Sequence, residues 1–96
     1  KITMLYYICY DISNNRKRKK VSDILTDYGL RVQYSIFQAE LTAKKLKEIQ
    51  KKTDPLIDKK TDSIMFLPLC KNCEEKIVLV GNSYSVIKLN FISDVD

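Results

Sequence analysis

One acidic residue and a run of basic residues stand close together near the start of this chain. Asp11 ends an apolar stretch, and five consecutive cations, Arg16 to Lys20, follow after four intervening residues. A carboxylate is a hard oxygen ligand that suits magnesium or manganese, and clustered cations suit a phosphate backbone. Two plainer interpretations stay open, because Asp11 could cap a turn and the cations could form a solvated surface.

The chain contains no histidine, which excludes histidine-based nucleophiles and acid–base pairs. Its two glycines, Gly29 and Gly81, stand alone, so the sequence has no glycine-rich phosphate loop. If a twofold axis brought two copies of Asp11 together, the two acids could share a metal ion that neutralises a phosphate and activates a water molecule. These residues therefore favour a metal-dependent phosphodiesterase if the protein is an enzyme.

The three cysteines do not form a recognisable framework. Cys70 and Cys73 make one C-x-x-C motif, which is half of a structural zinc site because there is no second pair and no histidine. Glu74 and Glu75 are expected to raise the pKa of a neighbouring thiol, which disfavours a redox role. We therefore expect both cysteines of the motif to serve packing.

The net charge of +5 in 96 residues is unevenly distributed. Residues 1–52 carry 12 Lys and Arg against 5 Asp and Glu, whereas residues 53–96 carry 5 against 7. This asymmetry favours an anionic partner, with nucleic acid ahead of a membrane. No apolar run approaches the ~20 residues of a membrane helix, and no signal cleavage site follows the first apolar run, so we expect a cytoplasmic protein.

Hydrophobic patterning predicts the elements that would position these residues within a single domain, 1–96. The first apolar stretch is expected to be a central strand, and Pro68 places a later strand near an edge of the sheet. The predicted elements are a strand at 2–12, a helix at 15–28 that stops at Gly29, a strand at 30–41, a helix at 42–54 capped by Thr42, and strands at 62–70 and 76–81.

The predicted strand that follows the first helix alternates along its length. This alternation places Val32, Tyr34 and Ile36 on one face and Arg31 and Phe37 on the other. Phe37 is the exception, because it is an apolar residue on an otherwise polar face.

We expect these elements to form an α+β domain of the ferredoxin-like βαββαβ type, with an antiparallel sheet and two helices on one face. The other face of the sheet would then be uncovered. A last strand-like stretch, at about 82–96, has no obvious place in a four-stranded domain. We infer that it pairs with the sheet edge of a second copy, in a twofold homodimer that buries the open face.

Two blocks of the sequence resemble the CRISPR-associated protein 2 family. Residues 4–41 combine an apolar strand ending in Tyr-Asp, a basic stretch leading into an amphipathic helix, a glycine stop and the motif R-V-Q-Y-S-I-F. Residues 62–81, DSIMFLPLCKNCEEKIVLVG, extend the similarity to nearly the whole chain. The resemblance implies a homodimer completed by exchanged C-terminal strands, with a divalent metal ion, Mg²⁺ or Mn²⁺, held between two copies of Asp11.

The resemblance also implies a function. Members of the family are described as metal-dependent endonucleases on single-stranded RNA or double-stranded DNA that act in defence against viruses. They also form the scaffold on which a partner integrase captures new spacer DNA. Two hypotheses follow: a CRISPR-associated, magnesium-dependent endonuclease, or a non-catalytic DNA-binding scaffold that bridges integrase subunits during spacer acquisition.

Site residues are implied by position in the matching motifs. Asp11 corresponds to the metal-binding and catalytic acid, with Tyr10, Ser35 and Phe37 as supporting residues. Lys20 stands where some relatives have arginine, so the charge is kept and the bidentate fork is lost. The expected nucleic-acid-binding residues are Arg16, Lys17, Arg18, Lys20 and Arg31.

Overall fold

A computed structural model describes residues 2–81 of the chain. The elements, in chain order, are β1 (Met4–Asp11), α1 (Asn15–Thr26), β2 (Leu30–Gln33), β3 (Ile36–Leu41), α2 (Ala43–Thr53), the 3₁₀ helix η1 (Asp54–Leu56), β4 (Ser63–Leu69) and α3 (Lys71–Glu74). These elements follow the βαββαβ order of the predicted fold type, with a short helix after it, although two of the strands differ from those predicted. The strand predicted at about 82–96 lies outside the described residues.

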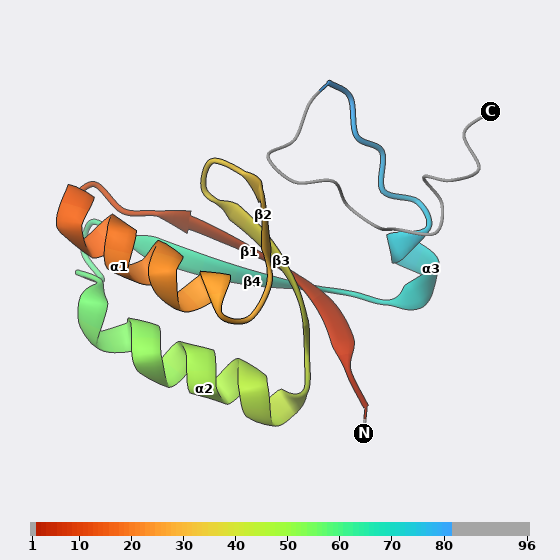
Figure 1. Ribbon diagram of the computed structural model, residues 1–96, viewed down its shortest axis with the longest axis horizontal. Helices are drawn as coiled ribbons and strands as arrows, with labels where there is room; N and C mark the ends of the chain where they lie inside the picture. The colour runs from red at the N-terminus through yellow and green to blue at the C-terminus, as the bar shows by residue number, and fades with distance from the viewer. Residues whose placement is uncertain (1, 82–96) are drawn as a thin grey trace.

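The four strands form one antiparallel sheet in the order β2-β3-β1-β4 (Figure 1). β1 is central, as its apolar sequence predicts, and β4, which contains Pro68, is an edge strand. An edge tolerates proline because one side of the strand needs no ladder hydrogen bonds. This arrangement is the expected ferredoxin-like fold.

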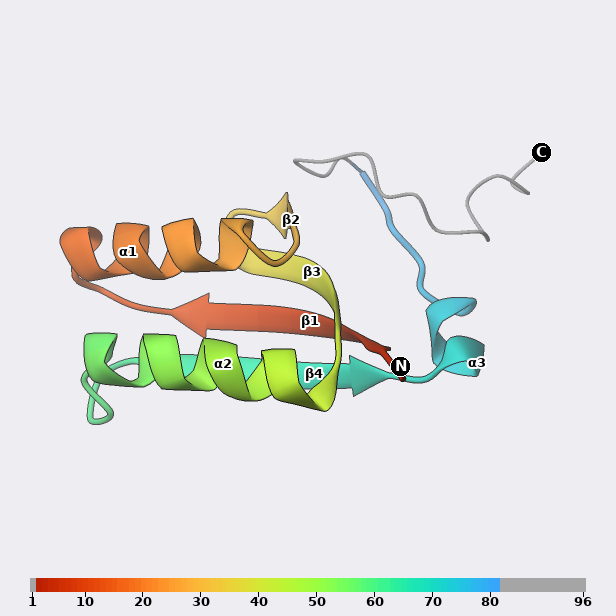
Figure 2. The same ribbon diagram turned by 60° about the horizontal axis from the view of Figure 1, so that its bottom comes forward.

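Helices α1 and α2 pack on the same face of the sheet (Figure 2). The hydrophobic core between the sheet and the helices is formed by alternate residues of β1 and β3 and by the apolar stripes of the two helices. Its buried members are Ile8, Tyr10, Ile12, Val21, Leu25, Phe37, Ala39, Leu41 and Ile49. Neither helix, nor any other among the described residues, is long and apolar enough to cross a membrane.

Both long helices begin after a capping side chain, and the cap predicted at Thr42 is confirmed. The side chain of Asn14 accepts a hydrogen bond from the backbone N–H of Lys17 at 2.9 Å, and Thr42 accepts one from Lys45 at 3.1 Å. Such caps satisfy N–H groups that have no partner within the helix.

Gly29 has a different role from the predicted helix stop. Helix α1 already ends at Thr26, and Gly29 does not have a positive φ. A Cβ atom at this position would lie 2.1 Å from the carbonyl oxygen of Gln38. Glycine is therefore required because the chain passes directly against β3.

The single strand predicted at 30–41 is wrong. A turn at Tyr34 and Ser35 divides it into β2 and β3, and a bulge interrupts the register between Arg31 and Gln33. Strict alternation therefore does not run through the segment. Phe37 is not on a polar face but in the core, at 1% exposure, whereas Tyr34 is exposed.

The strand predicted at 76–81 is also absent from the sheet that the structure describes. After β4 the chain forms α3 and then a segment without regular structure, in which Val78 and Val80 are 81% and 89% exposed. The sequence has strand composition there, but the sheet of residues 2–81 offers it no partner, because the β2–β3 hairpin supplies the fourth strand.

The face of the sheet opposite the helices is open and largely apolar. The pairing register places Tyr7 and Cys9 of β1 beside Leu67 and Met65 of β4 on this face. Met65 is 53% and Leu67 is 42% exposed. The uncovered face predicted from the sequence is therefore present in the isolated chain. Of the β1 side chains on this face, Leu5 is buried and Tyr7 and Cys9 are half-buried.

Candidate nucleic-acid interface

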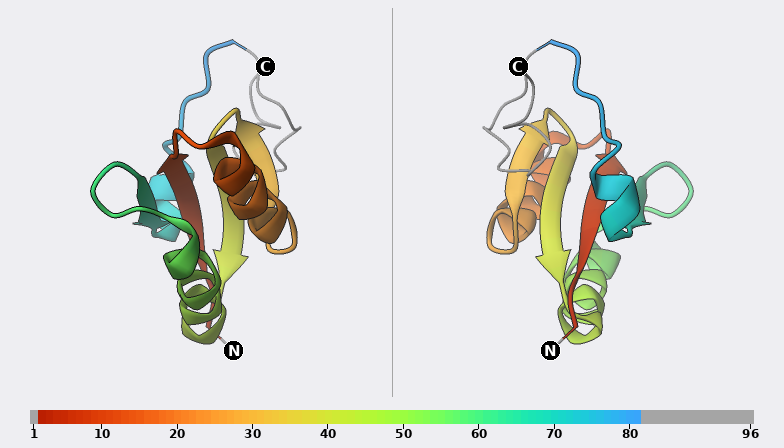
Figure 3. Two further views of the ribbon diagram at one scale, coloured as in Figure 1. Left: turned by 90° about the vertical axis from the view of Figure 1, so that its left-hand side faces the viewer. Right: turned by 90° about the vertical axis from the view of Figure 1, so that its right-hand side faces the viewer.

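The chain gathers most of the predicted site residues at one end of the sheet. β1 ends there at Asp11, which pairs with Ser63 at the start of β4. Three residues separate the end of β1 from the start of α1 at Asn15. The β2–β3 turn lies beside Tyr10, whose backbone N–H donates to the carbonyl oxygen of Ser35 at 3.1 Å. This end faces the viewer in the left panel of Figure 3.

Asp11 lies on the open face of the sheet, at its end. Tyr10 and Ile12 on either side point into the core, so the pleat directs Asp11 the other way. Asp11 is exposed, and within residues 2–81 its carboxylate makes no hydrogen bond or ion pair. Within the described residues, no contact therefore supports the alternative interpretation that Asp11 caps a turn.

A second acid at this end is already engaged. The carboxylate of Asp62 accepts a hydrogen bond from the backbone N–H of Asp58 at 2.9 Å and one from the Thr61 hydroxyl at 3.2 Å. The bond from Asp58 is the main reason why the pKa of Asp62 lies below its usual range, with Thr61 and the charge of Lys17 acting in the same direction. Asp62 thus orders its loop, and Asp11 is the available carboxylate.

The start of α1 presents cations on two sides. Arg16, Lys17 and Lys20 line a hollow of about 730 Å³ between α1 and η1, which Asn14, Asn15, Pro55 and Leu56 complete. Cations in the first turns of a helix oppose its dipole, so their placement is unfavourable for the helix alone. An anion held in the hollow would offset that cost.

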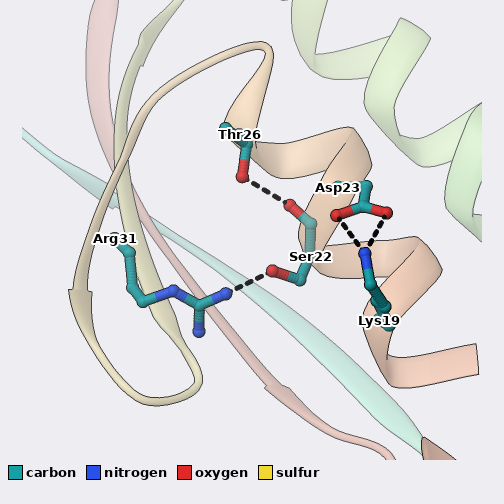
Figure 4. A network of polar contacts seen from close by, with 5 residues as sticks. All are labelled: Lys19, Ser22, Asp23, Thr26 and Arg31. Carbon is teal, nitrogen blue, oxygen red and sulfur yellow. Dashed lines mark hydrogen bonds and ion pairs between the residues drawn. The ribbon is translucent and has the colours of Figure 1, made fainter. Parts of the chain in front are cut away.

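Arg31 occupies a second hollow, of about 240 Å³, between α1 and the β2–β3 hairpin. Its guanidinium donates to the Ser22 hydroxyl (Figure 4) and to the carbonyl oxygen of Tyr34, and it lies 3.4 Å from the Tyr10 hydroxyl. It also stands over the Phe37 ring, 4.9 Å from the ring centroid. The planar fork of arginine is thereby held in one orientation.

Arg18 lies on the same side of α1 as Arg31. Its guanidinium donates to the carbonyl oxygen of Ile12 at 3.0 Å and to the Asn15 side chain, and lies 5.9 Å from the centroid of the Tyr34 ring. Both arginines line the smaller hollow. Lys19 is paired with Asp23 at 3.0 Å, so much of its charge is balanced locally (Figure 4).

The predicted site residues therefore fall into three groups. Asp11 stands alone on the open face, Arg16, Lys17 and Lys20 line the larger hollow, and Arg18, Arg31 and Tyr10 line the smaller one. Phe37 supports Arg31 from the core, and Ser35 contributes a backbone carbonyl to the end of β1. One chain does not bring the acid and the two arginines into contact within the described residues.

Sequence reasoning missed Asn15, Ser22 and Tyr34 as parts of this site. Asn15, Arg18 and Ser22 recur at the spacing i, i+3, i+7 of one helix face. This polar stripe on an amphipathic helix could have identified Asn15 and Ser22 as parts of the site from the sequence. Tyr34 carried no signal, because the turn that exposes it was not predicted.

The fold and this site define a class: a small ferredoxin-like domain with cations gathered at one end of its sheet and an apolar open face. The chain matches the model of the family CRISPR associated protein Cas2 over residues 4–77. It belongs to this family.

The relatives of the chain agree with this assignment. The CRISPR-associated endoribonuclease Cas2 3 of Synechocystis sp. is 46% identical over 65 residues, which cover 68% of this chain and 71% of that protein. The structure of Cas2 from Streptococcus pyogenes superposes with a TM-score of 0.74 at 31% identity, over 81% of this chain and 100% of that one. A chain of a partial Cas6-RT-Cas1–Cas2 complex gives a TM-score of 0.71 at 27% identity, over 88% and 93% of the two chains.

Proposed function

We propose that this protein is a CRISPR-associated, metal-dependent endonuclease that works as a homodimer on RNA or double-stranded DNA. The observation that carries the proposal is the placement of Asp11. Asp11 is exposed and, within residues 2–81, its carboxylate has no hydrogen bond or ion pair. It lies on the open apolar face, at the same end of the sheet as the cations of α1. The similarity to a protein named an endoribonuclease supports the same activity.

The metal would require two chains. Among residues 2–81 no three acidic or cysteine side chains are grouped closely enough to hold a metal ion, so this part of one chain does not complete a metal site around Asp11. Two carboxylates from a pair of chains form a hard oxygen donor set suited to Mg²⁺ or Mn²⁺. Such an ion supplies charge neutralisation at a phosphate and lowers the pKa of a bound water molecule.

The protein's own residues would bind and orient the nucleic acid. Arg16, Lys17 and Lys20 provide cations that can bind successive phosphates, since they line one hollow. Arg18 and Arg31 are held by their hydrogen bonds on the other side of α1 and present donors at fixed positions. Binding along this end would bring a phosphodiester toward the edge of the open face where Asp11 lies.

The open face supports the homodimer. Contiguous apolar side chains that remain exposed on a small domain mark an interaction surface. Pairing of two open faces would cover Met65 and Leu67 and place Asp11 of each chain at the interface. The exchange of residues 82–96 between the two subunits belongs to this proposal.

The test compares the full chain with the variant Asp11→Asn, which removes the charge and keeps the shape. Cleavage of labelled single-stranded RNA and double-stranded DNA is measured with Mg²⁺ and with Mn²⁺. We expect a loss of at least about 100-fold, because metal stabilisation of a transition state is worth several kcal/mol. Glu40→Gln is the matched control, since Glu40 pairs with Leu5 at the other end of the open face. Equal cleavage by Asp11→Asn and the wild type would contradict the proposal.

A second candidate function is a non-catalytic DNA-binding scaffold beside an integrase subunit. The similarity to a chain of a Cas1–Cas2 complex favours it. In this case Asp11→Asn should keep both DNA binding and spacer integration by the assembled complex. The logarithm of the binding constant should fall with the logarithm of salt concentration with a slope of ~0.9 for each phosphate neutralised. Substitution of Arg16, Lys17 and Lys20 by glutamine should reduce that slope.

A further inference from the structure

Two cysteines stand at the end of the molecule opposite Asp11. Cys70 directly follows β4, and Cys73 lies in α3. The register pairs Leu69 with Leu5 at this end of the sheet and Ser63 with Asp11 at the other. α3 faces the viewer in the right panel of Figure 3. The pair is therefore remote from the candidate nucleic-acid interface.

Both thiols are exposed, so the packing role predicted from the sequence is wrong. They are three residues apart across one turn of helix, a spacing that places two side chains on the same face. Cys70 is the N-cap residue of α3 and Cys73 lies in its first turn, so the two thiols are near enough for each to shift the pKa of the other. Two exposed and adjacent thiols are therefore present without a packing function.

The two thiols differ in acidity. The backbone N–H and the thiol of Cys73 both lower the pKa of the Cys70 thiol. The Cys70 side chain makes no capping hydrogen bond to α3. The hydrogen bond to Cys70 raises the pKa of Cys73. Glu74 and Glu75, which were expected to raise the pKa of a neighbouring thiol, are not among the causes of either shift. Burial raises the pKa of Cys9, so Cys70 is the most acidic of the three thiols.

We propose that Cys70 and Cys73 form a reversible dithiol–disulfide site that reacts with a low-molecular-weight disulfide such as glutathione disulfide. The Cys70 thiolate attacks one sulfur of the oxidant, which forms a mixed disulfide and releases one glutathione thiolate. The Cys73 thiol then loses its proton and attacks the Cys70 sulfur, which forms the Cys70–Cys73 disulfide and releases the second glutathione. Two protein thiols are oxidised, and one small disulfide is reduced to two thiols.

A metal site is the alternative use of the same pair, and the described residues do not complete one. Two thiolates are half of the four ligands that structural zinc takes. No third acidic or cysteine side chain joins the pair within residues 2–81 to make a metal-binding group. Disulfide exchange with a small disulfide needs two neighbouring thiols and no further ligand, and the start of α3 supplies both thiols.

The experiment incubates the full chain in glutathione buffers of increasing oxidising strength and quenches the thiols by alkylation at successive times until equilibrium. Peptide mass spectrometry maps the products at each time. We expect one disulfide between Cys70 and Cys73, with Cys9 alkylated throughout. In Cys73→Ser the reaction should stop at the first step, so that a glutathione adduct accumulates on Cys70. In Cys70→Ser an adduct on Cys73 should form more slowly. Cys9→Ser is the control and should match the wild type.

Three results would overturn the proposal. The first is that no Cys70–Cys73 disulfide forms across the range of buffers. The second is that Cys9 reacts with glutathione disulfide as fast as Cys70 does. The third is that the adduct in Cys70→Ser forms as fast as that in Cys73→Ser, which would remove the distinction between an attacking and a resolving thiol. None of these results depends on nuclease activity.

Discussion

Asp11 and Arg31 illustrate two ways in which a polar residue is prepared for function. Asp11 is left without a partner in the described chain, so its carboxylate is available to a ligand. Arg31 is the opposite case, because Ser22, the carbonyl oxygen of Tyr34 and the Phe37 ring hold its guanidinium in place. A substitution at Asp11 should therefore change chemistry alone, whereas one at Arg31 should change binding and stability together.

The variant Arg31→Lys tests this distinction. Lysine keeps the charge but cannot reach the same acceptors with a planar fork. Because hydrogen bonds from charged groups each contribute about 1.5–3 kcal/mol, we expect the free energy of unfolding to fall by about 1–3 kcal/mol and the affinity for RNA or DNA to fall with it. Urea denaturation and fluorescence anisotropy measure the two effects.

Arg16→Lys is the matched control for that variant. Arg16 is exposed and lies in the larger hollow, where lysine can place its charge equally well. Unfolding and binding should both stay close to the wild type. If both substitutions had the same small effect, the proposed role of the Arg31 contacts would be wrong.

The residues of the site were predictable only in part. Asp11 and the cations after it are local in sequence, so a motif identifies them. Ser22 becomes a partner of Arg31 only because α1 packs beside β2, and sequence separation hides such a contact. The hydrogen bonds that separate the acidities of Cys70 and Cys73 likewise depend on the local fold of α3.

At the scale of elements, the close approach of two backbone segments restricts which residue can occupy the position between them. Gly29 marks the place where the chain leaving α1 passes against β3. Gly29→Ala should therefore destabilise the protein by about 1–3 kcal/mol, the usual cost of overpacking, as measured by urea denaturation.

A second substitution separates the two possible reasons for this glycine. Asparagine tolerates a left-handed helix cap but has a Cβ atom. Gly29→Asn should thus destabilise at least as much as Gly29→Ala. Recovery of stability in Gly29→Asn would show that the backbone conformation, and not the contact with Gln38, requires glycine.

The elements show where pattern reasoning succeeds and where it fails. β1, α1 and α2 were predictable because their apolar periods and caps are local. The division of residues 30–41 into two strands was not, because a turn at Tyr34 and Ser35 lacks the glycine, proline or asparagine that usually marks one. Residues 76–81 were predicted as a strand from composition, but a strand also needs a neighbour to pair with.

At the scale of the molecule, the helical side and the open face of the sheet have different surface chemistry. The helical side and the start of α1 carry cations, whereas the open face is apolar with Asp11 at one end. The apolar open face suits another copy of the chain, and the cationic side suits a polyanion. The proposed enzyme needs both, because Asp11 is the one carboxylate that residues 2–81 place without a partner at this end of the open face.

Leu67→Lys tests the pairing of the open faces. A charge on this face, midway along the edge strand β4, should prevent association and leave the fold intact, since Leu67 is already 42% exposed. We expect sedimentation velocity to give a dimer for the wild type and a monomer for the variant, with loss of cleavage. Ile2→Lys is the control, because Ile2 is 91% exposed and lies outside the sheet.

The binding of Mn²⁺ by the full chain, measured by isothermal titration calorimetry, tests the central claim most directly. Two chains that share one ion through paired copies of Asp11 should give a stoichiometry of one ion for every two chains, and Asp11→Asn should abolish the binding. An ion bound by each chain independently of Asp11, or no binding by a wild-type dimer, would contradict the account.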